Sequence, residues 1–137
     1  MKRICESLAF VTALAPKSVS ASTDTTSGYV DASGADEVCF ILSAGALGAG
    51  KSLTATLMAA GDAEGSGAAA VGEAVTFTDA VGTEPQTALI SYKVDPQKGR
   101  YLAVKFQHDA ADAVVCGVLA AAKQVYRPAP NAWTVLM

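Results

Sequence analysis

The sequence predicts an all-β protein, a single-domain, jelly-roll-like β-sandwich of about seven to eight short antiparallel strands with extended N- and C-terminal arms. Several segments alternate apolar and polar residues at a period of two, which is typical of half-buried strands. Turn residues separate these segments at short intervals, and no segment shows a convincing amphipathic helical pattern. At 137 residues, the chain is long enough for one core but too short for two domains.

The chain divides into three expected parts. Residues 1–27 form an N-terminal arm and linker, in which Leu8–Ala13 is a candidate strand that pairs either with the body or with a neighbour, and Ser18–Ser27 is rich in serine and threonine. Residues 28–126 form the sandwich. Residues 127–137 form an extended tail, because two prolines interrupt regular structure there. We expect the arm up to Pro16 and the tail to reach neighbouring subunits.

Three strands are expected in the first half of the body. Glu37–Ala44 is a short apolar run typical of a central strand. Ser52–Ala60 alternates leucine and alanine with threonine, and the loop Gly45–Lys51 is expected to join these two strands as a hairpin. The glycine- and alanine-rich stretch Gly61–Gly72 is expected as an exposed connection, after which Glu73–Thr78 resumes the alternation.

The second half predicts another hairpin and a final strand. Ala88–Val94 and Tyr101–His108 both alternate, and the turn Asp95–Gly99 between them combines proline with glycine. Ala113–Ala122 has the alanine content of a helix, but its valines and Gly117 favour a buried strand.

The segment Gly45–Ser52 matches the phosphate-binding pattern GxxxxGK[ST]. In that motif a helix must follow the loop so that its N-terminal dipole meets the anion. Here the residues after Ser52 alternate at period two and stop at Gly61, which favours a strand. The motif is therefore interpreted as a loop between strands, and phosphate binding by it is left open.

No catalytic, cofactor-binding or metal site is predicted, and the chain is not expected to be an enzyme. Cys5, Cys39 and Cys116 form no metal-binding or disulfide pattern, and the last two are expected in the core. The single histidine, His108, is expected to be structural. No serine, cysteine or threonine lies in a nucleophile motif.

The composition also limits the partners. A net charge of -3 with scattered basic residues does not favour nucleic-acid binding. No stretch reaches the roughly 20 apolar residues of a membrane span. The N-terminus partly imitates a secretory signal, but Glu6 interrupts the apolar region, so we expect synthesis in the cytoplasm.

The order of several short segments resembles a family of small structural proteins encoded among the head genes of tailed phages and prophages. These segments are Ala15-Pro16, Gly28-Tyr29-Val30-Asp31, Val38–Ala44, Gly45-Ala46-Leu47-Gly48, Leu53-Thr54-Ala55-Thr56-Leu57, Ile90-Ser91-Tyr92-Lys93-Val94, Gly99-Arg100-Tyr101-Leu102-Ala103-Val104 and Val125-Tyr126-Arg127-Pro128. Each is weak alone, and together they span nearly the whole chain. The longer loop over residues 61–72 and the apolar C-terminus, which includes Trp133, depart from the pattern.

The resemblance implies a non-enzymatic virion protein, most specifically a capsid decoration or cement subunit that stabilises the shell. Its implied partners are the major capsid protein and copies of itself, for which a trimer is one arrangement that the resemblance suggests, with no nucleic acid and no membrane. The implied location is the capsid surface after synthesis in a bacterial host. Three alternatives stay open: a neck, tail or fibre-associated sandwich, a P-loop nucleotide binder, and a secreted adhesive module with a mature start at Ser22.

Overall fold

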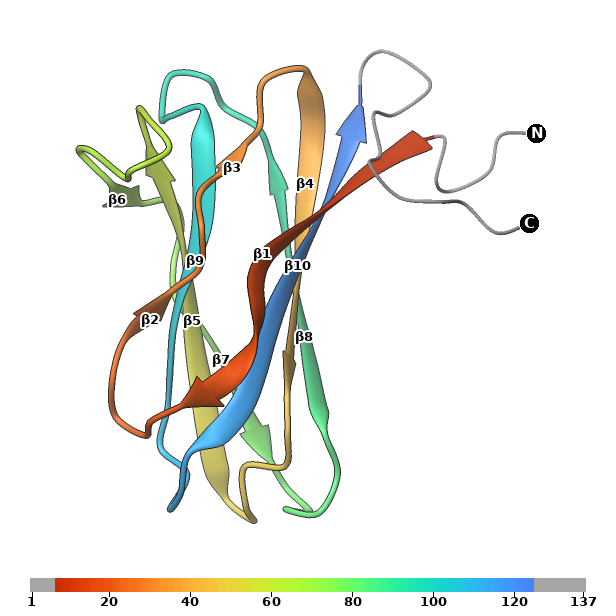
Figure 1. Cartoon of the computed structure of the whole chain (residues 1–137), viewed down its shortest axis with the longest axis vertical. Coiled ribbons are helices and arrows are strands. Elements are labelled where there is room, and N and C mark those ends of the chain that lie inside the picture. The colour runs from red at the N-terminus through yellow and green to blue at the C-terminus, as the bar shows by residue number, and fades with distance from the viewer. Residues whose placement is uncertain (1–6, 125–137) are drawn as a thin grey trace.

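The structure is a computed structural model that describes residues 7–124, and all of its regular elements are strands (Figure 1). The ten strands are β1 (Leu8–Val19), β2 (Thr25–Thr26), β3 (Val30–Asp31), β4 (Ala35–Ala44), β5 (Lys51–Ala60), β6 (Ala69–Ala70), β7 (Val75–Asp79), β8 (Gln86–Lys93), β9 (Tyr101–His108) and β10 (Val114–Gln124). The predicted tail over residues 127–137, Cys5 and Trp133 lie outside the described residues.

The strands form two antiparallel sheets. The first sheet, called sheet A, has the order β1-β10-β4-β8. The second, sheet B, has the order β2-β9-β5-β6, with β3 also pairing with β9 and β7 with β5. β2 and β3 can be taken together as one interrupted strand of sheet B, and so can β6 and β7. Counted in this way, the chain passes repeatedly from one sheet to the other. This is the jelly-roll arrangement, and the predicted fold class is confirmed.

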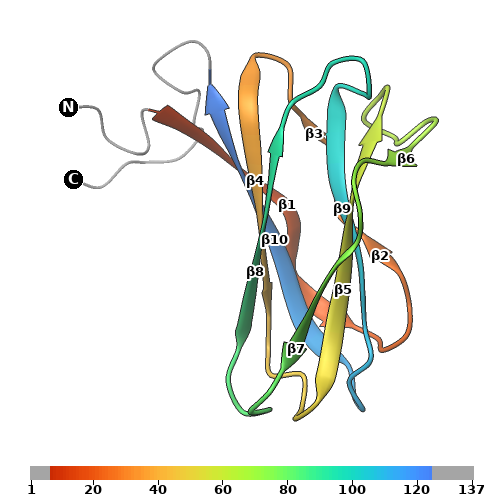
Figure 2. The same cartoon turned by 180° about the vertical axis from the view of Figure 1, so that it is seen from behind.

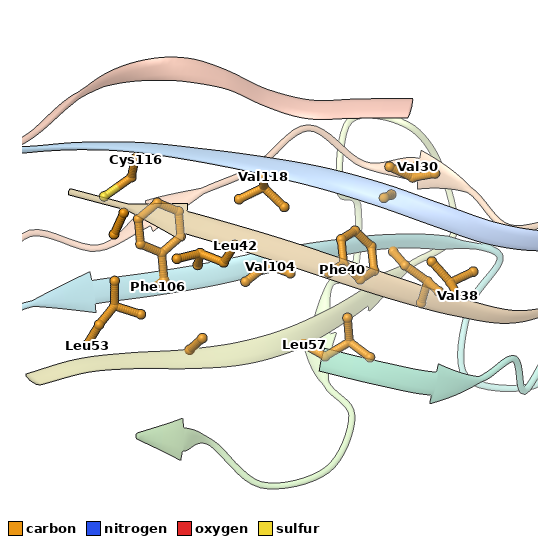
Figure 3. Packing of buried hydrophobic residues seen from close by; sticks show 14 of the residues in the cluster. Val30, Val38, Phe40, Leu42, Leu53, Leu57, Val104, Phe106, Cys116 and Val118 are labelled. Atoms are coloured by element: carbon orange, nitrogen blue, oxygen red, sulfur yellow. The ribbon is translucent and has the colours of Figure 1, made fainter. Parts of the chain in front are cut away.

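The core lies between the two sheets and follows from side-chain alternation (Figure 3). In β4 the even-numbered residues Val38, Phe40 and Leu42 are fully buried. In β10 the even-numbered residues, such as Cys116 and Val118, are buried as well. Sheet B supplies the opposite layer, which contains Leu53, Leu57, Leu102, Val104 and Phe106. Because successive side chains of a strand point to opposite faces, the odd-numbered residues of β4 and β10 must lie outside.

Both predicted hairpins are wrong, although the strands on each side of them are correct. β4 pairs with β10 and β8 in sheet A, whereas β5 pairs with β9, β6 and β7 in sheet B. In the same way β8 lies in sheet A and β9 in sheet B. The loop Gly45–Gly50 and the turn Asp95–Gly99 therefore cross from one sheet to the other. Turn chemistry specifies that a chain reverses, but it does not specify whether the two strands share a sheet.

The expected arm is also corrected, because from Leu8 onward it belongs to the sandwich. β1 pairs with β10 along its length, with irregularities between Thr12 and Leu14 and between Leu14 and Lys17. Beyond it, β2 lies within the expected linker and β3 lies just after it, and both pair with β9. The part of β1 after Ala13 is not recognisable from the sequence. Ala15, Pro16 and Lys17 weaken the alternation there, and the proline interrupts the hydrogen-bond ladder.

Replacement of two leucines of neighbouring strands tests the two sides of sheet A. Leu42→Ala, at a fully buried position, should lower the free energy of unfolding by about 2–5 kcal/mol through a cavity. Leu89→Ala, where the side chain is 66% exposed, should change it by about 0.5 kcal/mol or less. Denaturant unfolding of both variants measures the difference, and equal losses would contradict the assigned faces.

Candidate interaction surface

The outward face of sheet A is apolar, which is unusual for a sheet that faces solvent. On the central strands β4 and β10, the odd-numbered side chains are small or apolar from Cys39 to Ser43 and from Val115 to Ala121. We call this surface the apolar face; it comprises Phe10 of β1, Cys39 and Ile41 of β4, Leu89 of β8, and Val115, Leu119 and Ala121 of β10. An antiparallel sheet with one solvated face normally carries polar residues there.

The strand register places these residues side by side. Leu119 lies opposite Thr12 on one side and Ile41 on the other. Ile41 in turn lies opposite Leu89, so one row of side chains crosses all four strands. Leu89 and Val115 are the most exposed members of the apolar face, at 66% and 57%. From Leu119 through Ile41 to Leu89 the row is therefore continuous apolar surface.

Charged side chains bound the apolar face at one end. Lys123, Glu37 and Lys93 form the next row across β10, β4 and β8, and their charges alternate in sign. Lys123 also lies 3.8 Å from the carboxylate of Asp36. A polar rim around an apolar centre is the usual composition of a protein-binding surface.

A shallow hollow interrupts the apolar face at Gly117. It has a volume of about 290 Å³ and is lined by residues that include Leu14, Pro16, Ile41 and Leu119. The hollow exists because Gly117 has no side chain; a Cβ there would come within 3.3 Å of the Pro16 ring. An apolar side chain of a partner would fit such a depression.

The outward face of sheet B has the opposite character. Ser52, Thr54 and Thr56 of β5 point outward, and the first two share hydrogen bonds of 2.9 and 3.0 Å with Thr78 and Thr76 of β7. On β9 the outward Lys105 pairs with Asp24 at 3.5 Å. The hydroxyl and charged groups of this face are solvated and paired with each other. Only sheet A therefore presents a surface whose burial would be favourable.

The phosphate-binding pattern is a loop between the sheets and opens no helix. Residues Lys51–Ala60 after the loop form β5, as the alternation predicted. Ser52, the residue that would bind Mg²⁺ in a phosphate site, donates its N–H to Asp109 Oδ1 and shares a hydrogen bond with Thr78. The helix dipole that phosphate binding requires is absent after this loop.

A buried carboxylate of the chain itself, that of Asp79, accepts a hydrogen bond from this loop, as a bound phosphate would in a phosphate-binding loop. Asp79, at the end of β7, is 1% exposed. Its Oδ2 accepts the N–H of Leu47 at 3.0 Å, and its Oδ1 accepts the N–H of Gly82 at 2.8 Å. These N–H groups, that of Gly82 first, lower the pKa of Asp79 from its ordinary value of 3.8. No sequence pattern indicated this role, since Asp79 comes directly after the predicted strand Glu73–Thr78 and belongs to no motif.

His108 and the cysteines take structural positions. His108 is 1% exposed; its Nε2 donates to the carbonyl of Val19 at 2.8 Å, and its Nδ1 accepts the N–H of Ala110 at 3.2 Å. This is the structural role that the sequence predicted. Cys116 lies in the core, and burial raises the pKa of its thiol. Cys39 was expected in the core as well, but its odd position in β4 places it on the apolar face.

An ion pair joins two segments that the family resemblance identified. Arg100 donates from Nε and a terminal nitrogen to the two oxygens of Asp31, at 2.9 and 2.8 Å. The guanidinium holds the pKa of Asp31 well below its usual range, and Arg100 also lies 5.3 Å from the ring centre of Tyr101. This contact fastens β3 to the start of β9 at one end of sheet B.

A cleft also opens between β8 and sheet B. It has a volume of about 410 Å³, and Leu57, Val75, Ile90 and Tyr92 contribute to its lining. Tyr92 Oη is buried and has no hydrogen-bond partner among residues 7–124. Within that same range, no group of three His, Cys, Asp or Glu residues could hold a metal ion. No helix of the described chain is long and apolar enough to cross a membrane.

Comparison with known proteins supports the fold and gives no family. No protein-family model matches the sequence, and no curated protein matches it. Among solved structures, latent PorU of Porphyromonas gingivalis aligns with 87% of this chain and 13% of its own, at 12% identity and a TM-score of 0.52. Tailspike protein 4 of bacteriophage CBA120, in its enzymatically active domain, aligns with 88% of this chain and 20% of its own, at 10% identity and a TM-score of 0.51.

Infectious bursal disease virus, Gx strain, supplies another similar structure. It aligns with 89% of this chain and 33% of its own, at 16% identity and a TM-score of 0.47. The chain thus spans only a small part of each of these three structures. At identities of 10–12%, the likeness to latent PorU and to the phage tailspike establishes the fold alone.

The anchoring of the loop by Asp79 can be tested by pH. Asp79→Asn should destabilise the protein at neutral pH, because an amide cannot accept from every N–H that the carboxylate binds. A carboxyl whose pKa is lowered on folding contributes stability above its ordinary pKa of 3.8, and loses it as the pH falls toward the folded value. The difference in unfolding free energy between wild type and variant should therefore shrink below pH 3.8.

Exposed Asp112→Asn serves as the control for the loss of one carboxylate. Denaturant unfolding at a series of pH values measures all three proteins. A difference for Asp79→Asn that is independent of pH, or equal to that of Asp112→Asn, would contradict the proposed anchor.

Proposed function

We propose that the protein is a non-enzymatic structural subunit of a virion, and more specifically a decoration or cement subunit that binds the assembled shell of major capsid protein through the apolar face. The observation that carries this proposal is the sequence of β4 and β10. In the middle of both strands, from Cys39 to Leu42 and from Val115 to Ala122, the residues on both sides are apolar or glycine, which is typical of strands covered on both faces. Within residues 7–124 the fold covers only one side of these strands, and the proposed partner would cover the other.

The order of short segments along the chain supports the choice of partner. These segments resemble small head proteins of tailed phages, and the jelly roll is a fold that many viral capsid proteins use. The net charge of -3 favours a protein surface over nucleic acid. The protein would be made in the cytoplasm of a bacterial host and would act on the outer surface of the shell.

The proposed mechanism is association. A subunit that binds the expanded shell and not the dissociated capsid protein stabilises the shell by its binding free energy. Many copies, each held by a modest contact, together resist internal pressure. The apolar face supplies the area, and the hollow at Gly117 supplies a position for one apolar side chain of the capsid protein.

Shells purified from the phage or prophage that encodes the chain, and stripped of this subunit, provide the test. Leu119→Glu places a charge at the centre of the apolar face and should reduce binding about tenfold or more. Thr56→Glu, at a similarly half-buried position on the outward face of sheet B, is the matched control and should bind like wild type. Sedimentation of shells with bound protein measures the occupancy.

Equal occupancy of Leu119→Glu and wild type would contradict attachment through the apolar face. An image of the particle separates the two virion positions: decoration requires density over the whole shell, whereas a neck, tail or fibre component appears at one vertex only. Absence of the protein from purified particles would contradict the virion proposal as a whole.

The nucleotide-binding alternative has its own measurement. Because the Asp79 carboxylate already accepts the N–H of Leu47 in the loop and β5 follows it, we expect no heat of binding when ATP and Mg²⁺ are titrated into the protein. Lys51→Ala should behave identically. Saturable binding that Lys51→Ala abolishes would contradict this reading of the loop.

A further inference from the structure

β8 is an open edge of sheet A, and its side chains and register leave it unprotected. Within the described chain it pairs only with β4, and the register over Gln86–Lys93 contains no irregularity. Figure 2 shows β8 at the margin of its sheet. Its first seven residues include neither a charge nor a proline. Natural edge strands are normally blunted by bulges, prolines or lysines.

The other outer strand of sheet A carries such protection. β1 contains two register irregularities, together with Pro16 and Lys17. Proline lacks a backbone N–H, and bulges turn the edge away from a regular partner. The two margins of one sheet therefore differ, and only β8 has the regular edge that another strand can join.

The backbone of β8 presents a defined set of groups at this edge. The N–H of Val94 donates to the carbonyl of Asp36, next to the first residue pair of the β4–β8 ladder. In an antiparallel ladder the direction of backbone groups alternates with each residue, so even-numbered residues of β8 bond to β4. The odd-numbered residues Thr87, Leu89 and Ser91 then direct their N–H and C=O groups outward.

The side chains of the same residues are nearly symmetric about Leu89. Leu89 is 66% exposed, and two hydroxyl residues, Thr87 and Ser91, flank it at equal distances along the strand. Exposed Glu84 lies before the strand, and exposed Lys93 lies at its end. A strand with an apolar centre, polar flanks and opposite charges at its two ends is complementary to itself when reversed.

We propose that two copies of the chain pair antiparallel through β8, about a two-fold axis at Leu89. Leu89 of each copy then lies opposite Leu89 of the other, and Thr87 lies opposite Ser91. Lys93 of each copy lies opposite Pro85 of the other, one residue from Glu84. The two A sheets join into one eight-stranded sheet.

Charge favours this arrangement over the parallel one. A parallel pair in register would bring Lys93 beside Lys93 and Glu84 beside Glu84, and like charges opposite each other are destabilising. The antiparallel pair brings each lysine near a glutamate instead. A two-fold axis also closes the assembly at two copies, since both β8 edges are then used.

The contact is expected to be reversible. One strand pair buries less surface than the roughly 1,200–2,000 Å² of stable interfaces, so the dimer should form and dissociate with concentration. The dimer does not depend on what the protein binds in a virion. The dimer would, however, place the two apolar faces side by side on one sheet. The row of side chains that crosses sheet A from Thr12 ends at Leu89, and Leu89 lies on the two-fold axis.

Sedimentation velocity of the full chain over a range of concentrations tests the proposal. Wild type should pass from the monomer mass of 13.8 kDa to twice that mass as concentration rises. Leu89→Lys places two like charges on the axis and should raise the dissociation constant about tenfold or more. Glu84→Lys, at a position one residue from the one opposite Lys93 of the other copy, should weaken the dimer as well.

Val115→Lys is the matched control, because Val115 is similarly exposed on the apolar face but lies on β10, away from the β8 edge. It should dimerise like wild type, while thermal melts confirm that all variants are folded. Hydrogen exchange adds a readout by residue: the amides of Thr87, Leu89 and Ser91 should gain protection with concentration.

Three results would overturn the proposal. They are a monomer at every concentration, a trimer as the closed form, or a dimer that Val115→Lys abolishes and Leu89→Lys does not. None of these results bears on shell binding by Leu119→Glu, so failure of the dimer and failure of the proposed function are distinguishable.

Discussion

Side-chain alternation along β4 and β10 is the constraint on which the rest of the molecule depends. These strands lie at the centre of sheet A, and their even-numbered residues fill the core against sheet B. Once that set is buried, the period of two forces the odd-numbered set outward. Because that second set is also apolar, burial of the core necessarily exposes Ile41, Leu119 and Val115. The core and the apolar face are two consequences of the same two strands.

The same alternation explains what sequence could predict. Strands with clear periodicity, such as Ser52–Ala60 and Tyr101–His108, lie where the pattern placed them. β1 extends six residues beyond the predicted Leu8–Ala13, because its pairing comes from β10 and the local pattern past Ala13 is weak. The pairing of β4 with β10, and of β5 with β9, connects residues far apart in the chain. No local signal distinguishes such contacts from the hairpins that turn residues suggest.

The loop at Gly45 shows the same limit for functional motifs. Its glycines and lysine match a phosphate-binding pattern, but the chemistry of such a loop depends on the element that follows and on what meets its N–H groups. The alternation after Ser52 correctly excluded the helix. That Asp79 would meet Leu47 could not be predicted, since 32 residues separate them and only the sandwich brings them together. The apolar face was likewise visible as two continuous apolar runs, which sequence alone could not distinguish from strands buried on both sides.

An apolar face and an unprotected edge on the same sheet are a hazard for a protein that acts alone, because both promote unspecific association. Both occur on sheet A, whereas the outward face of sheet B is polar and the β1 edge is protected. This distribution is consistent with an assembly in which one contact covers the β8 edge and another covers the apolar face. Pairing of β8 would consume the edge and double the width of the apolar face without exposing new backbone. Two weak faces held on one rigid sheet bind a repeating surface more strongly than either does alone, since the second contact forms at a high effective concentration. A self-complementary edge would thus increase the affinity of the face for any partner that presents its own sites in a regular array.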